Sequence, residues 1–392
     1  MKSDSSRRRF LAASVALPAA GLAKPSSVAE SNAALTAPAA APVSPAKPQY
    51  KTLGRTGLKV TTVSFGCMIT SDPSVIERAA DMGVIHFDTA RGYQGGNNER
   101  MVGNALKSRR KSLVVSSKSH GGTTQQALAD LDTSLQTIGT DYLDIWYLHA
   151  KNSGDEVTDQ LLEAQQIAKK AGKIRFAGVS THKGQDQVID RAIKCGMIDV
   201  VLVGYNFATD PKVGEAIAAA HKAGLGVVGM KVMAGGFRRM KPGERAYNVM
   251  KRDGAPLAAL KWVLNNPNID TTIPSITDME QLDEDFRAMS SKFTEADEKI
   301  LAQQLDYIRP LYCRQCGACE GMCPQGLPVA DILRCLMYAD GYGEYPLARE
   351  RFLELPGEVT SVRCRECSGC TIECPNGVHV SERLMRAQEL LA

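Results

Sequence analysis

Two runs of cysteines near the C-terminus constrain this 392-residue chain more than any other feature. Eight of its 11 cysteines fall in two runs after residue 312, and each run has the spacing Cys-x2-Cys-x2-Cys-x3-Cys-Pro. The other three, Cys67, Cys195 and Cys335, lie outside these runs. The first run is Cys313, Cys316, Cys319 and Cys323, and the second is Cys364, Cys367, Cys370 and Cys374. Clustered cysteines indicate a metal rather than disulfide bonds, so this segment predicts a metal centre.

The spacing resembles that of bacterial two-cluster ferredoxins. In that pattern three thiolates of a run bind one 4Fe-4S cluster, and the fourth cysteine, which precedes proline, reaches the other cluster. One cluster is therefore assigned to Cys313, Cys316, Cys319 and Cys374, and the second to Cys364, Cys367, Cys370 and Cys323. Tetrahedral zinc is the alternative, although zinc sites usually use separated Cys-x2-Cys pairs.

About 40 residues separate the two runs, far more than in a minimal ferredoxin. Residues 331–339 and 348–355 are predicted to be helices, with Cys335 in the core of the first. The segment 310–392 is therefore expected to be a small α-helical ferredoxin-like domain.

The N-terminus has the features of an export signal. Arg7, Arg8 and Arg9 precede Phe10 and a short apolar stretch, which together resemble a twin-arginine signal. A disordered basic tail is the alternative. The prediction is a signal peptide over residues 1–29, an Ala/Pro-rich linker over 30–49, and export by the twin-arginine route to the periplasm or another extracytoplasmic side.

Charge and hydropathy exclude two classes of partner. The net charge is +4, and removing the five basic residues and one acid of residues 1–29 leaves 42 of each. This balance predicts no nucleic-acid partner. The apolar run of the signal is too short to anchor the mature chain, so no integral membrane span is expected.

The middle of the chain alternates short apolar runs with amphipathic stretches. Helices are expected at 125–138 and 161–171, for example. Eight strand–helix pairs in about 240 residues predict a (β/α)8 TIM barrel over 50–309. A doubly wound sheet is the alternative. It would require a Gly-rich turn after the first strand, and Gly66-Cys67-Met68 is not such a turn. The predicted strands are 63–66, 84–90, 113–118, 142–149, 174–180, 200–205, 227–231 and 271–275.

Four polar residues stand at or just after consecutive strand ends: Asp88, Tyr93, Lys118 and His149. Singly, Asp88 could be a cap, Lys118 a solvated strand end and His149 a satisfied core histidine. In a barrel, however, these ends share one mouth where chemistry occurs. Together the four residues predict a catalytic site.

The sequence here resembles the aldo-keto reductase family, from Leu53 to Pro274. The match includes Phe-Asp-Thr-Ala-x-x-Tyr at 87–93, Tyr-Leu-Asp at 142–144 and Gly-Val-Ser at 178–180. The resemblance implies an oxidoreductase acting on a small carbonyl or alcohol, with Tyr93 as general acid and Lys118, Asp88 and His149 completing a tetrad. A nearby Lys118 ammonium should stabilise tyrosinate and lower the pKa of Tyr93.

The resemblance also implies a nicotinamide nucleotide, NADP or NAD. It places Ser180 and Thr181 near the carboxamide and Glu284 near the adenine. Ser275, a candidate nucleotide contact, follows Pro274 where many members carry a lysine before the residues that bind the 2′-phosphate. Lys231 and the basic run at 238–241 could bind phosphate. Leu202 stands where a glutamine is common, and Gln281 where an arginine is common.

Two accounts of the whole chain remain open. The first is an exported enzyme whose clusters transfer electrons, with a redox partner protein. The second is an electron-transfer protein whose barrel is a docking scaffold, since a hydride carries two electrons, a cluster carries one, and no flavin motif is evident. Clusters that only stabilise the fold are a third reading.

Overall fold

The computed structural model describes residues 47–235, 254–367 and 369–392. The described residues from 47 onward pack as one compact unit, so the barrel and the cysteine-rich segment are in contact. The predicted signal, most of the predicted linker and the basic run at 238–241 lie outside the described residues.

A closed parallel sheet forms the centre of the fold. Its eight strands are hydrogen-bonded in chain order, and bridges from Val63 to Thr272 and from Gly66 to Ser275 join the first strand to the last. Every predicted strand overlaps an observed one, so the (β/α)8 barrel is confirmed and the doubly wound alternative is wrong. The strands are β3 (Phe65–Gly66), β4 (His86–Asp88), β5 (Val114–Ser119), β6 (Leu143–Leu148), β7 (Ile174–Thr181), β8 (Val200–Gly204), β9 (Gly226–Met230) and β10 (Thr271–Thr272).

An antiparallel hairpin, β1 (Tyr50–Thr52) with β2 (Lys59–Thr61), covers the end of the barrel where the strands begin. Leu53 lies against Gly226 at the start of β9, where an added Cβ would come 2.6 Å from the Leu53 side chain. Leu53 also belongs to the buried cluster that fills the barrel interior, together with Ile145 and Leu202. The hairpin therefore leaves only the opposite end, where the strands finish, open for chemistry.

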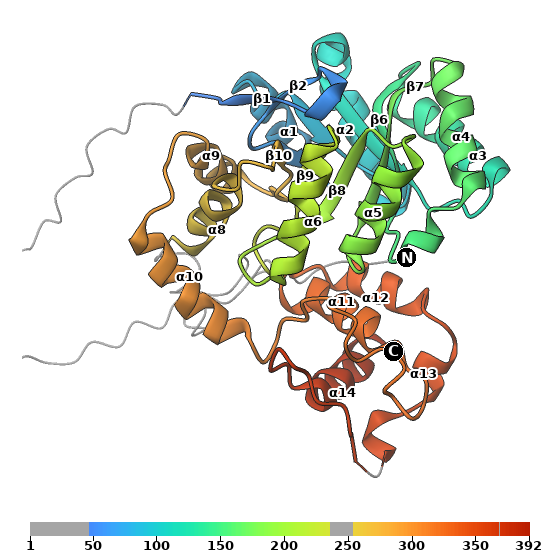
Figure 1. The fold of residues 1–392 in the computed structure, drawn as a ribbon, viewed down its shortest axis with the longest axis vertical. Helices are drawn as coiled ribbons and strands as arrows, with labels where there is room; N and C mark the ends of the chain where they lie inside the picture. The colour runs from blue at the N-terminus through green and yellow to red at the C-terminus, as the bar shows by residue number, and fades with distance from the viewer. Residues whose placement is uncertain (1–46, 236–253, 368) are drawn as a thin grey trace, which may run out of the picture. The chain divides into compact units, whose positions relative to one another are not determined.

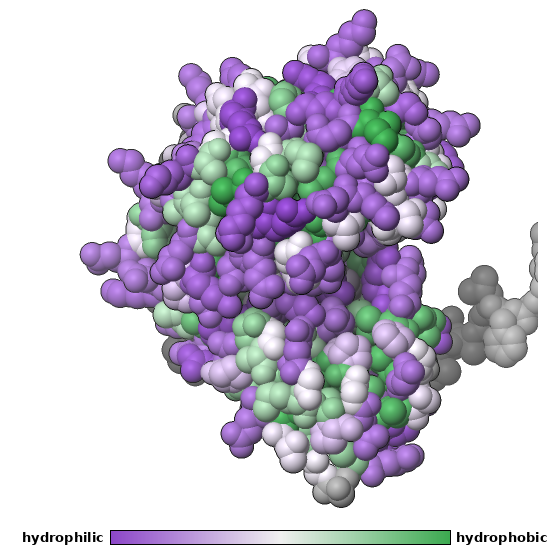
Figure 2. All heavy atoms as spheres, turned by 45° about the vertical axis from the view of Figure 1, so that its right-hand side comes forward, coloured by the Kyte–Doolittle hydropathy of each residue, from purple (hydrophilic) through white to green (hydrophobic). Residues whose placement is uncertain are grey.

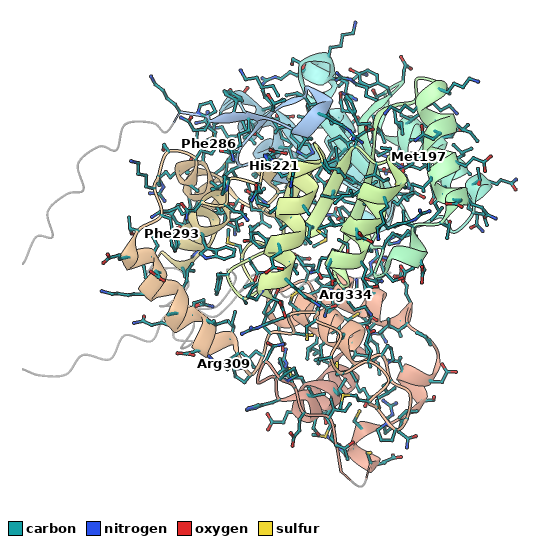
Figure 3. The ribbon with its side chains drawn as sticks, viewed as in Figure 1. Met197, His221, Phe286, Phe293, Arg309 and Arg334 are labelled. Atoms are coloured by element: carbon teal, nitrogen blue, oxygen red, sulfur yellow. The ribbon has the colours of Figure 1, made fainter. Side chains whose placement is uncertain are left out.

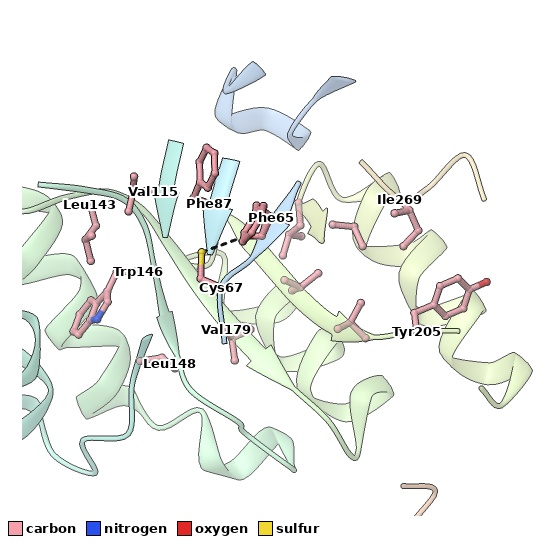
Figure 4. Close-up of a cluster of buried hydrophobic side chains, with 14 of the residues drawn as sticks. Phe65, Cys67, Phe87, Val115, Leu143, Trp146, Leu148, Val179, Tyr205 and Ile269 are labelled. Carbon is pink, nitrogen blue, oxygen red and sulfur yellow. Dashed lines mark hydrogen bonds between the residues drawn. The ribbon is translucent and has the colours of Figure 1, made fainter. Parts of the chain in front are cut away.

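Helices surround the barrel and bury their apolar faces against it (Figure 1). Figure 4 shows part of this layer, in which Phe65, Phe87 and Trp146 are buried and the Cys67 thiol lies 3.9 Å from the Phe65 carbonyl oxygen. The predicted helices at 125–138 and 161–171 are α3 and α4. Among the described residues, the α-helices up to residue 308 are α1 (Pro73–Asp81), α2 (Asn97–Leu106), α3 (Thr124–Ile138), α4 (Asp159–Lys170), α5 (Gln185–Cys195), α6 (Pro211–Lys222), α8 (Ala255–Leu264), α9 (Met279–Ala288) and α10 (Glu295–Ile308).

Side-chain caps fix where several of these helices begin. Thr123, Thr158 and Asp278 each accept a hydrogen bond from a backbone N–H in the first turn. Thr294 and Asp297 form a reciprocal capping box at the start of α10. Such caps satisfy N–H groups that have no partner within the helix.

The cysteine-rich segment folds around its own buried cluster. Its helices are α11 (Val329–Asp340), α12 (Tyr345–Leu353), α13 (Glu358–Ser361) and α14 (Val380–Leu391). Both helices predicted from the sequence are present as α11 and α12, and Cys335 is 1% exposed within α11. We refer to residues 310–392 as the cysteine domain.

The face of the molecule shown in Figure 2 is mostly polar, with more hydrophobic side chains in its lower part. Over the residues that the structure describes, no helix is both long and apolar enough to cross a bilayer.

Candidate active site and cysteine clusters

The Lys118 ammonium, at the end of β5, links two other members of the predicted tetrad, Asp88 and Tyr93. It forms an ion pair with Asp88 at the end of β4, and it donates to the Thr89 carbonyl oxygen at 2.7 Å and to the Tyr93 hydroxyl at 3.2 Å. Lys118 and Asp88 are 1% and 2% exposed. A buried ammonium with three acceptors is held in one position, so it fixes the Tyr93 hydroxyl at the barrel mouth.

His149, directly after β6, completes the group. Its ring lies edge-on to Tyr93, with ring centroids 5.9 Å apart, and stacks on His120 with centroids 4.0 Å apart. Burial lowers the pKa of His149 well below its usual value, and the nearby His120 and Lys118 lower it further. His149 is therefore a neutral imidazole, which can donate a hydrogen bond to a carbonyl oxygen without adding charge.

The predicted pKa of Tyr93 needs a correction. Burial raises the pKa of the phenol and Lys118 lowers it only in part, so the net shift is upward. Burial alone would also lower the pKa of Lys118, but Asp88 and Tyr93 raise it overall. Lys118 therefore acts in the predicted direction, while the enclosed site, which sequence reasoning did not anticipate, has the larger effect.

The tetrad faces a cavity of about 360 Å³. One wall is the barrel mouth, including Asp88, Tyr93 and His149, and the other wall belongs to the cysteine domain. Sequence reasoning missed His120 and His182, although both directly follow strand ends and the rule that found His149 would have found them. It also missed the second wall, formed by Arg334, Tyr338, Gly341, Tyr342, Leu347, Arg351, Glu354 and Leu355.

Specific contacts hold the cysteine domain against the barrel mouth. Asn206, after β8, donates to the Tyr312 hydroxyl at 3.1 Å, and Lys183, after β7, pairs with Glu320. A Cβ on Gly341 would come 1.8 Å from the Gly235 carbonyl oxygen. At Gly341 only glycine permits this approach of α11 to the loop after β9.

The structure does not bring Ser180 and Thr181 to the cavity wall. The Ser180 hydroxyl accepts from the Ala150 backbone N–H at 2.8 Å, and the Thr181 hydroxyl donates to the Lys183 carbonyl oxygen at 2.8 Å. The lining includes the next residue, His182, instead. Their role at a carboxamide stays a prediction.

Other residues predicted to contact a nucleotide do reach the cavity. Lys231 and Ser275 line it, as does Gln281 at the start of α9. Glu284 is partly buried on the same helix, and Leu202 is fully buried inside the barrel. Ser275, Gln281 and Lys231 thus give the cavity a polar side to which a nucleotide could bind.

The eight clustered cysteines form two groups in space. Burial raises the pKa of Cys313 to about 12, and Cys319, Cys316 and Cys374 raise it too. Burial likewise raises the pKa of Cys364, and Cys323, Cys370 and Cys367 add to the rise. Electrostatic interactions thus link three cysteines of one run with the fourth of the other, in line with the crossed assignment, whose ligand sets stay a prediction.

Hydrogen bonds to sulfur show that the first group suits thiolate ligands. The Asn376 amide, beyond the second run, donates to Cys316 Sγ at 3.4 Å, and the Gln315 amide donates to Cys313 Sγ at 3.4 Å. Gln315 and Gly317 adopt positive φ angles of 59° and 76°, which curl the loop around the group. Amide donors and a curled loop stabilise thiolates bound to metal.

Among the described residues no three His, Cys, Asp or Glu lie close enough to hold one metal ion. A four-iron cluster takes one thiolate on each iron, so its ligands need not meet at one point.

Two family profiles match the chain. Residues 71–305 match the profile described as "Aldo/keto reductase family", and residues 312–379 match a "4Fe-4S dicluster domain". The first match spans the barrel and the tetrad, and the second spans both cysteine runs.

Individual relatives agree with the first profile. The chain is 26% identical over 291 residues to "Uncharacterized oxidoreductase YqkF" of Bacillus subtilis, covering 64% of this chain and 94% of that protein. It is 26% identical to "L-galactose dehydrogenase" of Arabidopsis thaliana, covering 62% and 89% of the two chains. The holo form of aldo-keto reductase AKR11C1 from Bacillus halodurans has the same fold, with a TM-score of 0.56 and 24% identity over 65% of this chain and 96% of that one.

Proposed function

Since the chain belongs to the aldo/keto reductase family and carries a 4Fe-4S dicluster domain, we propose that this oxidoreductase reduces a small carbonyl compound, or oxidises the corresponding alcohol, with a nicotinamide nucleotide. One observation carries the proposal: Tyr93, Asp88 and His149 line one cavity, and the buried Lys118 contacts both Tyr93 and Asp88. A barrel used only as a docking scaffold would not need a buried ammonium aimed at a phenol. The site therefore favours the enzyme over the scaffold.

In this proposal Tyr93 supplies the proton that reduction requires. Its hydroxyl donates to the carbonyl oxygen, and the proton passes to that oxygen as the alkoxide forms. Lys118, 3.2 Å from the Tyr93 oxygen, then stabilises the tyrosinate that remains. Asp88 keeps the ammonium in place, and neutral His149 orients the carbonyl oxygen from the side.

A bound nicotinamide nucleotide supplies the hydride. Ser275 and Gln281 are the lining residues that would hold it, through a hydroxyl and an amide. The wall that the cysteine domain contributes would limit the access of water to the reacting atoms.

We also propose that the cysteine domain binds two 4Fe-4S clusters, one for each group of cysteines. The support is the grouping itself, with Cys374 beside Cys313 and Cys323 beside Cys364. The clusters would exchange single electrons with a redox partner protein. Purified protein should then contain about eight irons and eight acid-labile sulfides per chain, whereas zinc with little sulfide would refute this part.

Titration of cluster-replete protein with NADPH and NADH tests the hydride chemistry. Fluorescence should report saturable binding, and a panel of aldehydes should be turned over at the expense of the nucleotide. If neither nucleotide binds, the hydride chemistry is wrong and the electron-transfer scaffold becomes the better account.

Export by the twin-arginine route is a further part of the proposal, supported by Arg7, Arg8 and Arg9 before Phe10. That route carries folded proteins, so clusters and a bound nucleotide could be inserted before transport. Replacing all three arginines by lysine keeps the charge but removes the guanidinium pair that the receptor distinguishes. The variant should accumulate in the cytoplasm with its clusters, and normal export of this variant would refute the assignment.

A further inference from the structure

Arg334 is a cation of the cysteine domain that lines the barrel's cavity. It lies on α11 with a side chain that is 19% exposed, and Figure 3 shows it where α11 meets the barrel. Its Nη2 donates to Asp331 at 3.0 Å. Its Nε is buried and has no hydrogen-bond partner among the described residues. A buried guanidinium N–H without an acceptor is costly, so an acceptor from a ligand in the cavity would be favourable.

The described lining of the cavity carries more positive than negative charge. Of the charged lining residues, Asp88 is paired with the buried Lys118, and Arg351 is paired with Glu354. Arg334 and Lys231 are the other cations of the described lining. Asp331 offsets part of the charge of Arg334, but it also lies 3.7 Å from Lys183.

Lys231 lies opposite the face of α11 that carries Arg334. Its ammonium is 5.0 Å from the ring centroid of Tyr338, one helical turn after Arg334, and 5.8 Å from that of Tyr342. Within the described part of the chain, no carboxylate pairs with Lys231 at ion-pair distance. Lys231 also has a φ of 56°, an unfavourable conformation for a residue other than glycine, and such strain is concentrated at functional sites.

Arg334 and Lys231 also affect a histidine of the barrel mouth, His182. Burial lowers the pKa of His182 well below its usual value, and Lys231, Arg334 and Lys118 lower it further. His182 Nδ1 is buried and, within the described ranges, unpaired. Arg334, Lys231 and Tyr93 line the same cavity, so an anion held by the two cations would share that cavity with the Tyr93 hydroxyl.

We propose that the cavity takes a carbonyl compound bearing a carboxylate, such as a 2-oxo acid or a carboxylated aldehyde. Arg334 and Lys231 bind the carboxylate while the carbonyl oxygen meets Tyr93. The position of the carbonyl rests on the proposed function, whereas the carboxylate site does not. The substrate site is thus shared, since the cysteine domain contributes the arginine and the barrel contributes the proton donor.

Oxamate, an unreactive carboxylate, tests the anion site without turnover. Calorimetric titration of full-length, cluster-replete protein, with and without NADPH, should show binding that Arg334→Gln weakens about 10- to 100-fold. Arg334→Lys keeps the charge and should weaken binding less. Arg349→Gln, which removes an exposed arginine of α12, is the matched control and should bind as the wild type does. Equal oxamate affinity in the wild type and Arg334→Gln, or no binding to either, would overturn the proposal.

A matched pair of substrates separates a substrate carboxylate from a nucleotide phosphate. The ratio of kcat/KM for 4-carboxybenzaldehyde to that for benzaldehyde should fall about 10- to 100-fold in Arg334→Gln. If this ratio holds while affinity for NADPH falls, the cations bind the nucleotide and the proposal is wrong. If no nucleotide binds but oxamate binding still depends on Arg334, the hydride chemistry fails and the carboxylate site stands.

Discussion

Arg351 of α12 donates from Nη2 to the carbonyl oxygen of Gly92 at 2.9 Å, and Gly92 directly precedes Tyr93, the proposed proton donor. A Cβ on Gly92 would lie 3.1 Å from that nitrogen, so glycine leaves the guanidinium room to approach. The two residues are 259 positions apart in the sequence. The cysteine domain therefore supports the loop that carries Tyr93, in addition to its proposed clusters.

Arg351→Gln should loosen this loop. Loss of a charge-assisted hydrogen bond of about 1 kcal/mol should lower kcat/KM for aldehydes roughly threefold to tenfold, because Tyr93 spends less time in position. Hydrogen exchange at residues 91–96 should become faster, while the visible spectrum of the clusters should persist. Arg349→Gln on the same helix is the control. Unchanged exchange and kinetics in Arg351→Gln would show that the contact does not position Tyr93.

Lys118→Met should alter the pH dependence of the reaction. Burial raises the pKa of Tyr93 and Lys118 opposes that rise, so losing the ammonium raises the pKa further. A phenol is protonated below its pKa, so Tyr93 remains an acid at neutral pH in both forms. Alcohol oxidation needs tyrosinate, so its rate should increase with pH, and in Lys118→Met the rise should move to higher pH.

The same variant should reduce aldehydes about 100-fold more slowly or worse at neutral pH, because the tyrosinate product is less stable. Its affinity for NADPH is the control for folding of the site. An unshifted pH profile for alcohol oxidation would contradict the role given to Lys118.

Cys374→Ser should damage the cluster held mainly by the other run. Cys374 lies beside Cys313, Cys316 and Cys319, so the loss should appear as about half the iron and sulfide, with the spectroscopic signature of one remaining cluster. Cys335→Ala is the matched control, because Cys335 is buried in α11 outside both groups and its removal should leave both clusters. A full iron content in Cys374→Ser would contradict the crossed assignment.

Asn376→Leu should make one cluster harder to reduce. The Asn376 amide donates to Cys316 Sγ, and a donor to sulfur stabilises the more negative, reduced state. Losing a hydrogen bond of about 1 kcal/mol should lower the potential of that cluster by about 40 mV. The other cluster should keep its potential, which a redox titration followed by electron paramagnetic resonance would check.

The barrel and its tetrad were predictable because both depend on short, local sequence patterns. Short apolar runs locate strands, and in a parallel barrel Asp88, Lys118 and His149 must then share one mouth. The grouping of Cys374 with Cys313 was predictable for a different reason, since the proline after each fourth cysteine redirects the chain.

The second wall of the cavity was not predictable from local patterns. It depends on contacts between distant segments, such as Arg351 with Gly92 and Asn206 with Tyr312, for which no motif exists. The upward pKa of Tyr93 follows from the same enclosure. Sequence patterns also did not predict which side chain at the end of a strand reaches the cavity. At Ser180, Thr181 and His182 the direction of each side chain depends on the local bend of the chain rather than on residue type.

A single-turnover measurement on Tyr93→Phe tests the central claim most directly. The variant keeps the ring but lacks the phenolic proton, so NADPH should bind with nearly wild-type affinity while oxidation of the bound nucleotide by an aldehyde falls about 100-fold or more. Stopped-flow absorbance of the bound nucleotide measures that rate without any contribution from product release. If Tyr93→Phe binds NADPH and reduces the aldehyde at the wild-type rate, Tyr93 is not the proton donor and the tetrad has been misassigned.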